Sequence, residues 1–143
     1  MNIWVNGCFD ILHTGHLDLL WYAKLYGSDR FCFDIKMETN RLFVGIDTDE
    51  RVKSHKGDDR PINSCADRMK MLENLKMVDR VVDFNSDAEL RQFIQIFDID
   101  YIVVGDHYKD KPVIGEEQTL HGVVYFPTDE RSSSTIIEKI MNL

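Results

Sequence analysis

Short apolar runs alternate along the chain with segments whose apolar residues recur at helical spacing. The runs cover residues 3–5, 42–46, 78–84, 101–105 and 122–126. After the first run, apolar residues recur three and four positions apart over residues 17–25, which is the spacing of a helix with one face toward a core. This alternation predicts an α/β domain: a Rossmann-like parallel sheet of five strands, ordered 3-2-1-4-5 and flanked by helices.

Another apolar pattern, after the first helix, does not fit this alternation. Phe31, Phe33 and Ile35 alternate with polar residues, as in a half-buried strand, and the polar residues 38–40 precede the next run. We therefore predict an inserted hairpin or edge extension near residues 30–40. Its role stays open between an oligomer contact and surface decoration.

The composition is that of a single globular domain spanning residues 1–143. Hydrophobic residues make up 43% and charged residues 29%, and no apolar run approaches the roughly 18 residues that a membrane span needs. The first residues lack the basic flank of a signal peptide, and three cysteines without paired spacing are typical of reduced thiols, so we expect a cytoplasmic protein. The net charge of −8 argues against a nucleic-acid partner, which would require a broad basic face.

The turn between the first strand and the first helix, residues 5–16, carries the clearest chemistry. Gly7 and Gly15 allow a sharp turn or a close approach to a ligand, and the helix that follows directs its unpaired N–H groups into the same space. His13 and His16 at this helix start can both donate hydrogen bonds to phosphoryl oxygens. The turn therefore predicts a site for a nucleotide phosphate.

Two other interpretations of the histidine pair remain open. A His-x-x-His pair also suits zinc, but His55, His107 and His121 are scattered and no Cys-x-x-Cys motif completes four ligands. The pair could also be purely structural. We predict no metal site in the protein itself.

The same turn resembles a known family signature. Its sequence GCFDILHTGH, residues 7–16, is similar to the HxGH signature of the nucleotidyltransferase superfamily and to the longer G-x-F-D-x-x-H-x-G-H of its cytidylyltransferase-like branch. The resemblance implies that His13 and His16 hold the α-phosphate of a nucleoside triphosphate. It also places Gly7, Phe9, Asp10 and Gly15 in nucleotide binding.

A loop after the second strand resembles one branch of that family. The sequence KGDDRPIN, residues 56–63, is similar to the KGxxRPIN loop in the adenylyltransferase domain of bacterial ADP-heptose synthases, more than to the loop of glycerol-3-phosphate cytidylyltransferases. Lys53 or Lys56 would steady the incoming phosphate or the developing charge. Arg68 lies in the first turn of the next helix, where a cation is unfavourable, and the resemblance assigns it to the nucleotide's phosphates.

The last two strands end in segments with family counterparts. Gly105 and Asp106 resemble a GDD or GGDY motif near the sugar phosphate and base, whereas His107 matches no fixed histidine. A hydroxyl-rich helix start resembles the STT-x-I motif that binds the triphosphate; its candidate residues are Ser133, Ser134 and Thr135. Thr128 stands where cytidylyltransferases commonly carry an arginine and Arg131 where they carry a glycine, so the sequence does not support cytidine specificity.

The resemblance implies nucleotidyl transfer with release of pyrophosphate, and Mg²⁺ bound mainly through the triphosphate. ATP and heptose 1-phosphate, giving the surface-sugar precursor ADP-heptose, is the preferred substrate pair. Glycerol-3-phosphate cytidylyltransferase with CTP and then FAD synthetase are the alternatives. The non-enzymatic alternative is a nucleotide-binding sensor on the same fold. The expected partners are the nucleotide, the sugar phosphate and a second copy in a homodimer, and the segment near residues 30–40 would be an insertion in this family.

Overall fold

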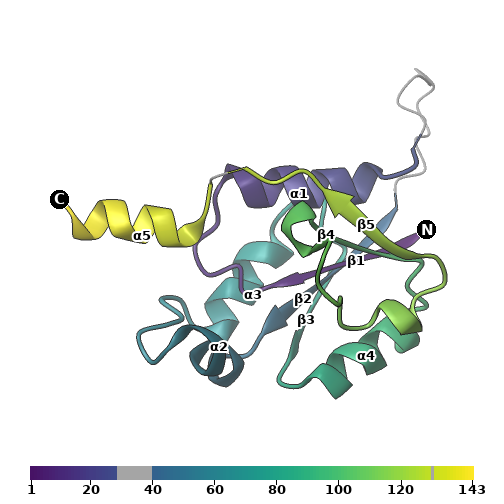
Figure 1. Cartoon of the computed structure of the whole chain (residues 1–143), viewed down its shortest axis with the longest axis horizontal. Coiled ribbons are helices and arrows are strands. Elements are labelled where there is room, and N and C mark those ends of the chain that lie inside the picture. The colour runs from purple at the N-terminus through teal and green to yellow at the C-terminus, as the bar shows by residue number, and fades with distance from the viewer. Residues whose placement is uncertain (29–39, 130) are drawn as a thin grey trace.

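The computed structural model describes residues 1–28, 40–129 and 131–143. Its sheet consists of β1 (Asn2–Gly7), β2 (Arg41–Asp47), β3 (Arg80–Phe84), β4 (Tyr101–Gly105) and β5 (Gly122–Phe126). All neighbouring strands are parallel and the order is β3-β2-β1-β4-β5, which confirms the prediction (Figure 1). The predicted hairpin or edge extension near residues 30–40 lies outside the described residues.

Helices fill the connections between the strands. They are α1 (Thr14–Leu25), α2 (Asp49–Lys56), α3 (Cys65–Glu73), α4 (Asp87–Ile96) and α5 (Ser133–Met141), with short 3₁₀ turns at Asp106–Tyr108 and Glu116–Gln118. Within the described ranges, no helix is both long enough and apolar enough to cross a membrane.

The sheet is covered on both faces, as the continuous apolar strands require. Ile3 and Val5 of β1 pack with Leu20 of α1 and Leu72 of α3 on one face. Trp4, between them in sequence, joins α4 residues on the other face. Figure 1 shows α1 and α4 on opposite sides of the sheet.

The pattern of the sequence does not predict α2. Val52 is the one buried residue of this helix among those the structure describes, so the helix has no apolar periodicity to detect. Its start is set instead by Thr48, whose side chain accepts a hydrogen bond from the Arg51 N–H. The helix follows β2 and therefore lies at the carboxyl end of the sheet.

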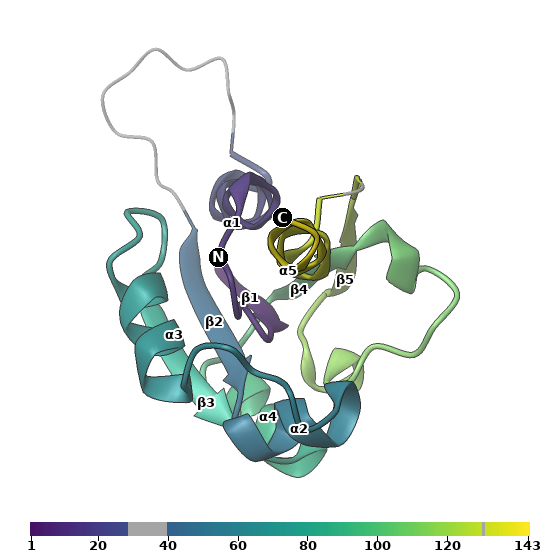
Figure 2. The same ribbon diagram turned by 90° about the vertical axis from the view of Figure 1, so that its left-hand side faces the viewer.

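Helix α5 differs from the others in how it is attached. It extends away from the sheet, although its first turn lies beside α1 (Figures 1 and 2). In the described part of the chain, none of its residues is buried. Its N-terminal end alone therefore belongs to the body of the domain.

Gly45 in β2 is required by the indole ring of Trp4 in the neighbouring strand. A Cβ atom at Gly45 would lie 2.2 Å from Cζ2 of Trp4, whose side chain is fully buried. We expect Gly45→Ala to lower the free energy of unfolding by about 1–3 kcal/mol, since overpacking strains a dense core. Urea unfolding measures this loss.

Trp4→Phe supplies the control for that substitution because the smaller ring vacates the space that the new methyl group needs. In the Trp4→Phe background, Gly45→Ala should cost clearly less than in the wild type. Equal costs in the two backgrounds would show that the indole does not exclude the methyl group.

Candidate active site

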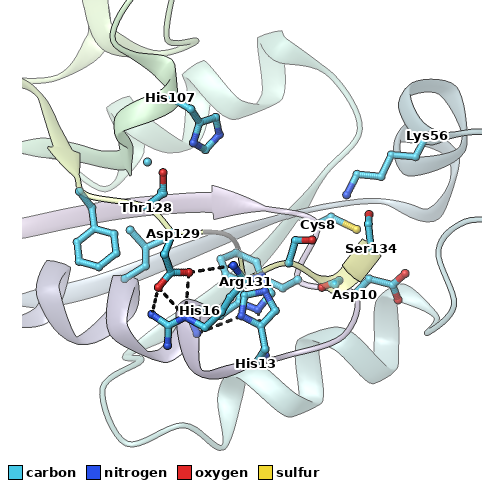
Figure 3. A pocket seen from close by; sticks show the side chains of 17 residues that line it. Cys8, Asp10, His13, His16, Lys56, His107, Thr128, Asp129, Arg131 and Ser134 are labelled. Carbon is cyan, nitrogen blue, oxygen red and sulfur yellow. Dashed lines mark hydrogen bonds and ion pairs between the residues drawn. The ribbon is translucent and has the colours of Figure 1, made fainter. Parts of the chain in front are cut away.

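A pocket opens where β1 ends, at the point in the sheet where the strand order reverses. The neighbours of β1 are β2 on one side and β4 on the other, and ligands of open α/β sheets bind at such a position. The β1–α1 turn, the end of α2, the end of β4 with the residues after it, and the segment from the end of β5 to the start of α5 contribute its walls (Figure 3). Four chain segments distant in sequence thus meet at one site.

Most of the predicted site residues line this pocket. They are Phe9, Asp10, His13, Gly15, His16, Lys56, Gly105, Ser133 and Ser134. Five predicted residues are not in its lining as the described residues form it: Gly7, Lys53, Arg68, Asp106 and Thr135. Figure 3 shows His13, His16 and Arg131 close together, with His107 and Lys56 on other sides of the pocket.

His13 and His16 are held by the backbone of the helix they start. His13 is the N-cap of α1, and its Nδ1 accepts the N–H of Gly15 at 3.1 Å. Nδ1 of His16 accepts the N–H of His13 in return at 3.2 Å, which closes a capping box. A neutral imidazole that accepts through Nδ1 carries its proton on Nε2, so each ring keeps one N–H donor for a ligand.

This geometry unites two of the interpretations of the pair. The rings do have a structural role as caps, and their centroids lie only 3.9 Å apart at the pocket wall. Because the caps fix ring position and tautomer, the same bonds prepare both Nε2–H groups for an anion. The structural role and the proposed chemical role are therefore one arrangement.

Burial lowers the pKa of both imidazoles and so favours their neutral form. Burial, with smaller contributions from His13 and Lys56, lowers the pKa of His16 to about 4. The pKa of His13 is also lowered, first by burial and then by the charge of Arg131. A phosphate group binding here would oppose these shifts, because an anion favours the protonated imidazole.

Two glycines permit the close packing of the pocket walls. A Cβ atom at Gly15 would lie 2.8 Å from Cε1 of His13, and one at Gly105 would lie 2.6 Å from the nearest atoms of His107 and Thr128. Both contacts are too short for a real side chain. The two glycines are therefore fixed by the positions of their neighbours in the pocket.

Asp10 ties the KGDDRPIN loop to the β1–α1 turn. Its carboxylate accepts the N–H groups of Ile62 and Asn63, both at 2.8 Å, and Nε of Arg60 at 3.0 Å. Its carbonyl accepts from the Asn63 side chain at 2.8 Å. Burial alone would raise the pKa of this carboxyl, but the hydrogen bonds from Asn63, Ile62 and Arg60 outweigh burial and lower it.

Arg68 lies under the pocket rather than in its wall. Its side chain is fully buried and donates to Asp49 at 2.8 Å, to the Cys8 carbonyl at 2.8 Å and to the Asn63 carbonyl at 3.0 Å. The guanidinium thus connects α2, the β1–α1 turn and the KGDDRPIN loop. These acceptors explain a cation in the first turn of α3, and the structure does not bring Arg68 to the pocket surface.

The start of α5 forms the wall beside the histidine pair. Oγ of Ser133 donates to the Ile11 carbonyl at 2.6 Å, and Oγ of Ser132 caps the helix by accepting the Thr135 N–H at 3.1 Å. Ser134 lies in the pocket lining. Two helix N-termini, of α1 and α5, therefore face the same space, which favours an anion.

Several lining residues were not among the predicted site residues. They are Cys8, Leu19, His107, Phe126, Thr128, Asp129, Arg131 and Ser132. Phe126 and Thr128 lie at or just after the carboxyl end of β5, so the rule that ligands bind at strand ends could have found them. Oγ1 of Thr128 donates to Asp106 at 2.6 Å, which ties the end of β4 to the segment after β5.

The carboxylates around the pocket are already paired. Asp10 is bound by the KGDDRPIN loop, and Asp129 accepts from the backbone and side chain of Arg131. Among the residues that the structure describes, no three His, Cys, Asp or Glu side chains gather as a metal site.

A parallel sheet with a pocket at its switch point, flanked by two helix N-termini, is the arrangement typical of nucleotide-binding α/β domains. The family model described as cytidylyltransferase-like matches residues 4–140. The chain belongs to this cytidylyltransferase-like family of nucleotidyltransferases.

The chain also resembles part of longer proteins. It is similar to the bifunctional protein HldE of Campylobacter fetus subsp. fetus (strain 82-40), with 38% identity over 138 residues, and of Helicobacter pylori (strain P12), with 41% identity over 138 residues. In both comparisons 96% of this chain matches only 27% of the relative, so the chain spans about a quarter of these proteins.

A solved structure has the same fold. It is the lipopolysaccharide core biosynthesis protein from Thermoplasma volcanium GSS1, with a TM-score of 0.66 at 20% sequence identity. The match covers 91% of this chain and 98% of that one. At this identity the similarity shows the fold.

The low pKa of His16 predicts a pH-dependent stability. Between the ordinary value of 6.5 and about 4, the unfolded chain binds a proton that the folded chain does not. The free energy of unfolding should therefore fall as the pH is lowered through this window. Urea unfolding at pH 7 and pH 5 measures the difference.

His16→Gln is the matched variant for this measurement, since glutamine at the third helical position can also accept the N-cap N–H but does not titrate. We expect the variant to fold and to lose a clear part of the stability change between pH 7 and pH 5. An unchanged pH dependence would contradict the assignment of the effect to His16.

Proposed function

We propose that this domain transfers AMP from ATP to a heptose 1-phosphate, forming ADP-heptose and pyrophosphate. One observation carries the choice of substrates: the KGDDRPIN loop, residues 56–63, is attached to Asp10 of the signature turn and brings Lys56 into the pocket. This loop resembles that of ADP-heptose synthases, and the similarity to the bifunctional protein HldE extends over the same segment.

The proposed reaction is an in-line displacement at the α-phosphorus of MgATP. An oxygen of the sugar phosphate forms a bond to the α-phosphorus, and the bond from that phosphorus to the bridging oxygen breaks. Pyrophosphate leaves with the electron pair of that bond. Such chemistry asks the protein mainly for positioning and for donors aimed at the developing charge.

The pocket supplies donors of this kind. The two Nε2–H groups of His13 and His16 would contact the α-phosphate. The first turn of α5, with the backbone of Ser133 and with Ser134, would hold the β- and γ-phosphates, because the Ser133 hydroxyl already donates to the Ile11 carbonyl. Lys56 would neutralise charge on the reacting or the incoming phosphate. Because its guanidinium is committed to protein acceptors, Arg68 is given the role of supporting the loop that carries these groups.

The experiment that tests the proposal is pyrophosphate release from the purified chain with Mg²⁺. ATP and CTP are each combined with heptose 1-phosphate, glycerol 3-phosphate and FMN. Release with ATP and heptose 1-phosphate alone is the expected result. Release only with CTP and glycerol 3-phosphate, or only with ATP and FMN, would replace the substrate assignment. Tight nucleotide binding with no release in any combination would support a sensor.

Lys53 and Lys56 form a matched pair for testing the site itself. Both belong to α2, but of the two the structure places only Lys56 in the pocket lining among the residues it describes. Lys56→Ala should lower kcat by about a hundredfold or more, as the loss of one preorganised donor does in comparable sites. Lys53→Ala should stay within about twofold of the wild type, as expected for an exposed residue outside the site.

Steady-state pyrophosphate release with the best substrate pair measures both variants. Equal losses in the two would mean that the lysines act through the stability of α2 or through the overall charge. A wild-type kcat in Lys56→Ala would show that Lys56 does not act in the reaction.

A further inference from the structure

Arg131 joins the two helix N-termini that face the pocket. Its Nη1 donates to Oγ1 of Thr14 at 2.8 Å and its Nη2 to Oδ2 of Asp18 at 2.8 Å, both in the first turns of α1. Its Nε donates to the Asp129 carboxylate at 2.7 Å and 2.9 Å, and its backbone N–H donates to the same carboxylate at 2.9 Å. The guanidinium is thus bound on the α1 side and on its own strand-to-helix segment.

Few other contacts hold this end of α5 in place. The helix has no fully buried residue in the described ranges, and its Ile136 and Ile137 are only half-buried, so apolar packing holds it less firmly than it holds the other helices. The hydrogen bond from Ser133 to the Ile11 carbonyl is the other polar attachment to the β1–α1 segment that the described contacts include. The position of Ser133 and Ser134 relative to His13 therefore depends on polar bonds that Arg131 mostly supplies.

We propose that Arg131 is a positioning residue that fixes the first turn of α5 against the first turns of α1 through Asp18 and Thr14. This inference rests on the proposed function insofar as the positioned groups bind a triphosphate. In this arrangement Arg131 keeps its bonds to Asp18 when the nucleotide binds. The ligand is held by the donors that Arg131 aligns.

In the competing role, Arg131 binds the phosphates directly. It would then replace the arginine that cytidylyltransferases commonly carry at the position of Thr128. The two roles predict opposite effects of removing Asp18, which is not in the pocket lining as the described residues form it. If Arg131 bound phosphate directly, Asp18→Ala would release the guanidinium and would leave nucleotide binding unchanged or strengthen it. If Arg131 aligns α5, Asp18→Ala weakens binding.

The test compares Asp18→Ala, Arg131→Ala, Arg131→Lys and the double variant Asp18→Ala/Arg131→Ala. Glu138→Ala is the control because Glu138 is an exposed residue farther along α5. We expect the Kd of MgATP, measured by calorimetry, to rise about threefold in Asp18→Ala and about tenfold in Arg131→Ala. The double variant should be no worse than Arg131→Ala, since both changes remove one interaction. The Kd of Arg131→Lys should lie between those of the wild type and of Arg131→Ala, because one ammonium group cannot replace the branched guanidinium.

A readout without nucleotide separates this inference from the proposed function. The N–H groups of Thr135 and Ile136 are bonded to Ser132 in the first turn of α5, so their hydrogen exchange reports whether that turn is held. Exchange should be faster in Asp18→Ala and Arg131→Ala and unchanged in Glu138→Ala. If the wild-type protein bound no nucleotide, the proposed function would fail. The hydrogen-exchange rates of Thr135 and Ile136 would still decide whether Arg131 holds the first turn of α5.

Two results would overturn the inference. One is unchanged exchange at Thr135 and Ile136 in both Asp18→Ala and Arg131→Ala. The other is an unchanged or lower Kd of MgATP in Asp18→Ala together with weaker binding in Arg131→Ala, which would make Arg131 a direct ligand.

Discussion

The site depends on a pair of backbone hydrogen bonds at the start of α1. Nδ1 of His13 and Nδ1 of His16 each accept a backbone N–H, so the rings that face the ligand are fixed by the same bonds that begin the helix. The glycine between them is required because His13 lies where its Cβ would be. The start of α1, the tautomer of both imidazoles and the direction of their N–H donors thus follow from this one short segment.

The polar and charged groups around the pocket divide into two kinds. Three arginines are paired with carboxylates and hold chain segments together: Arg60 with Asp10, Arg68 with Asp49, and Arg131 with Asp18 and Asp129. The described lining residues outside these pairs include the imidazoles of His13 and His16, Lys56 and the first turns of α1 and α5. Because neutral donors and dipoles cost less to desolvate than free cations, this division suits a pocket that must stay assembled without its ligand.

The sequence was sufficient for the sheet and for the signature turn. Five apolar runs predicted the strand order, because parallel strands buried on both faces require few polar positions. Arg68 shows what a pattern cannot reveal: its three acceptors come from Cys8, Asp49 and Asn63, on segments that meet only in the fold. Arg131 is similar, since its partners on α1 lie more than a hundred positions away.

The central claim is that the backbone caps fix the protons of His13 and His16 on Nε2 while burial favours the neutral form of both rings. Nitrogen-15 NMR of the imidazole rings at pH 7 measures both the charge and the tautomer directly. The account predicts neutral rings with the proton on Nε2 in both residues, and a perturbation of the Nε2 signals when MgATP is added. Rings protonated at Nδ1, or a charged imidazolium in the free protein at pH 7, would contradict it.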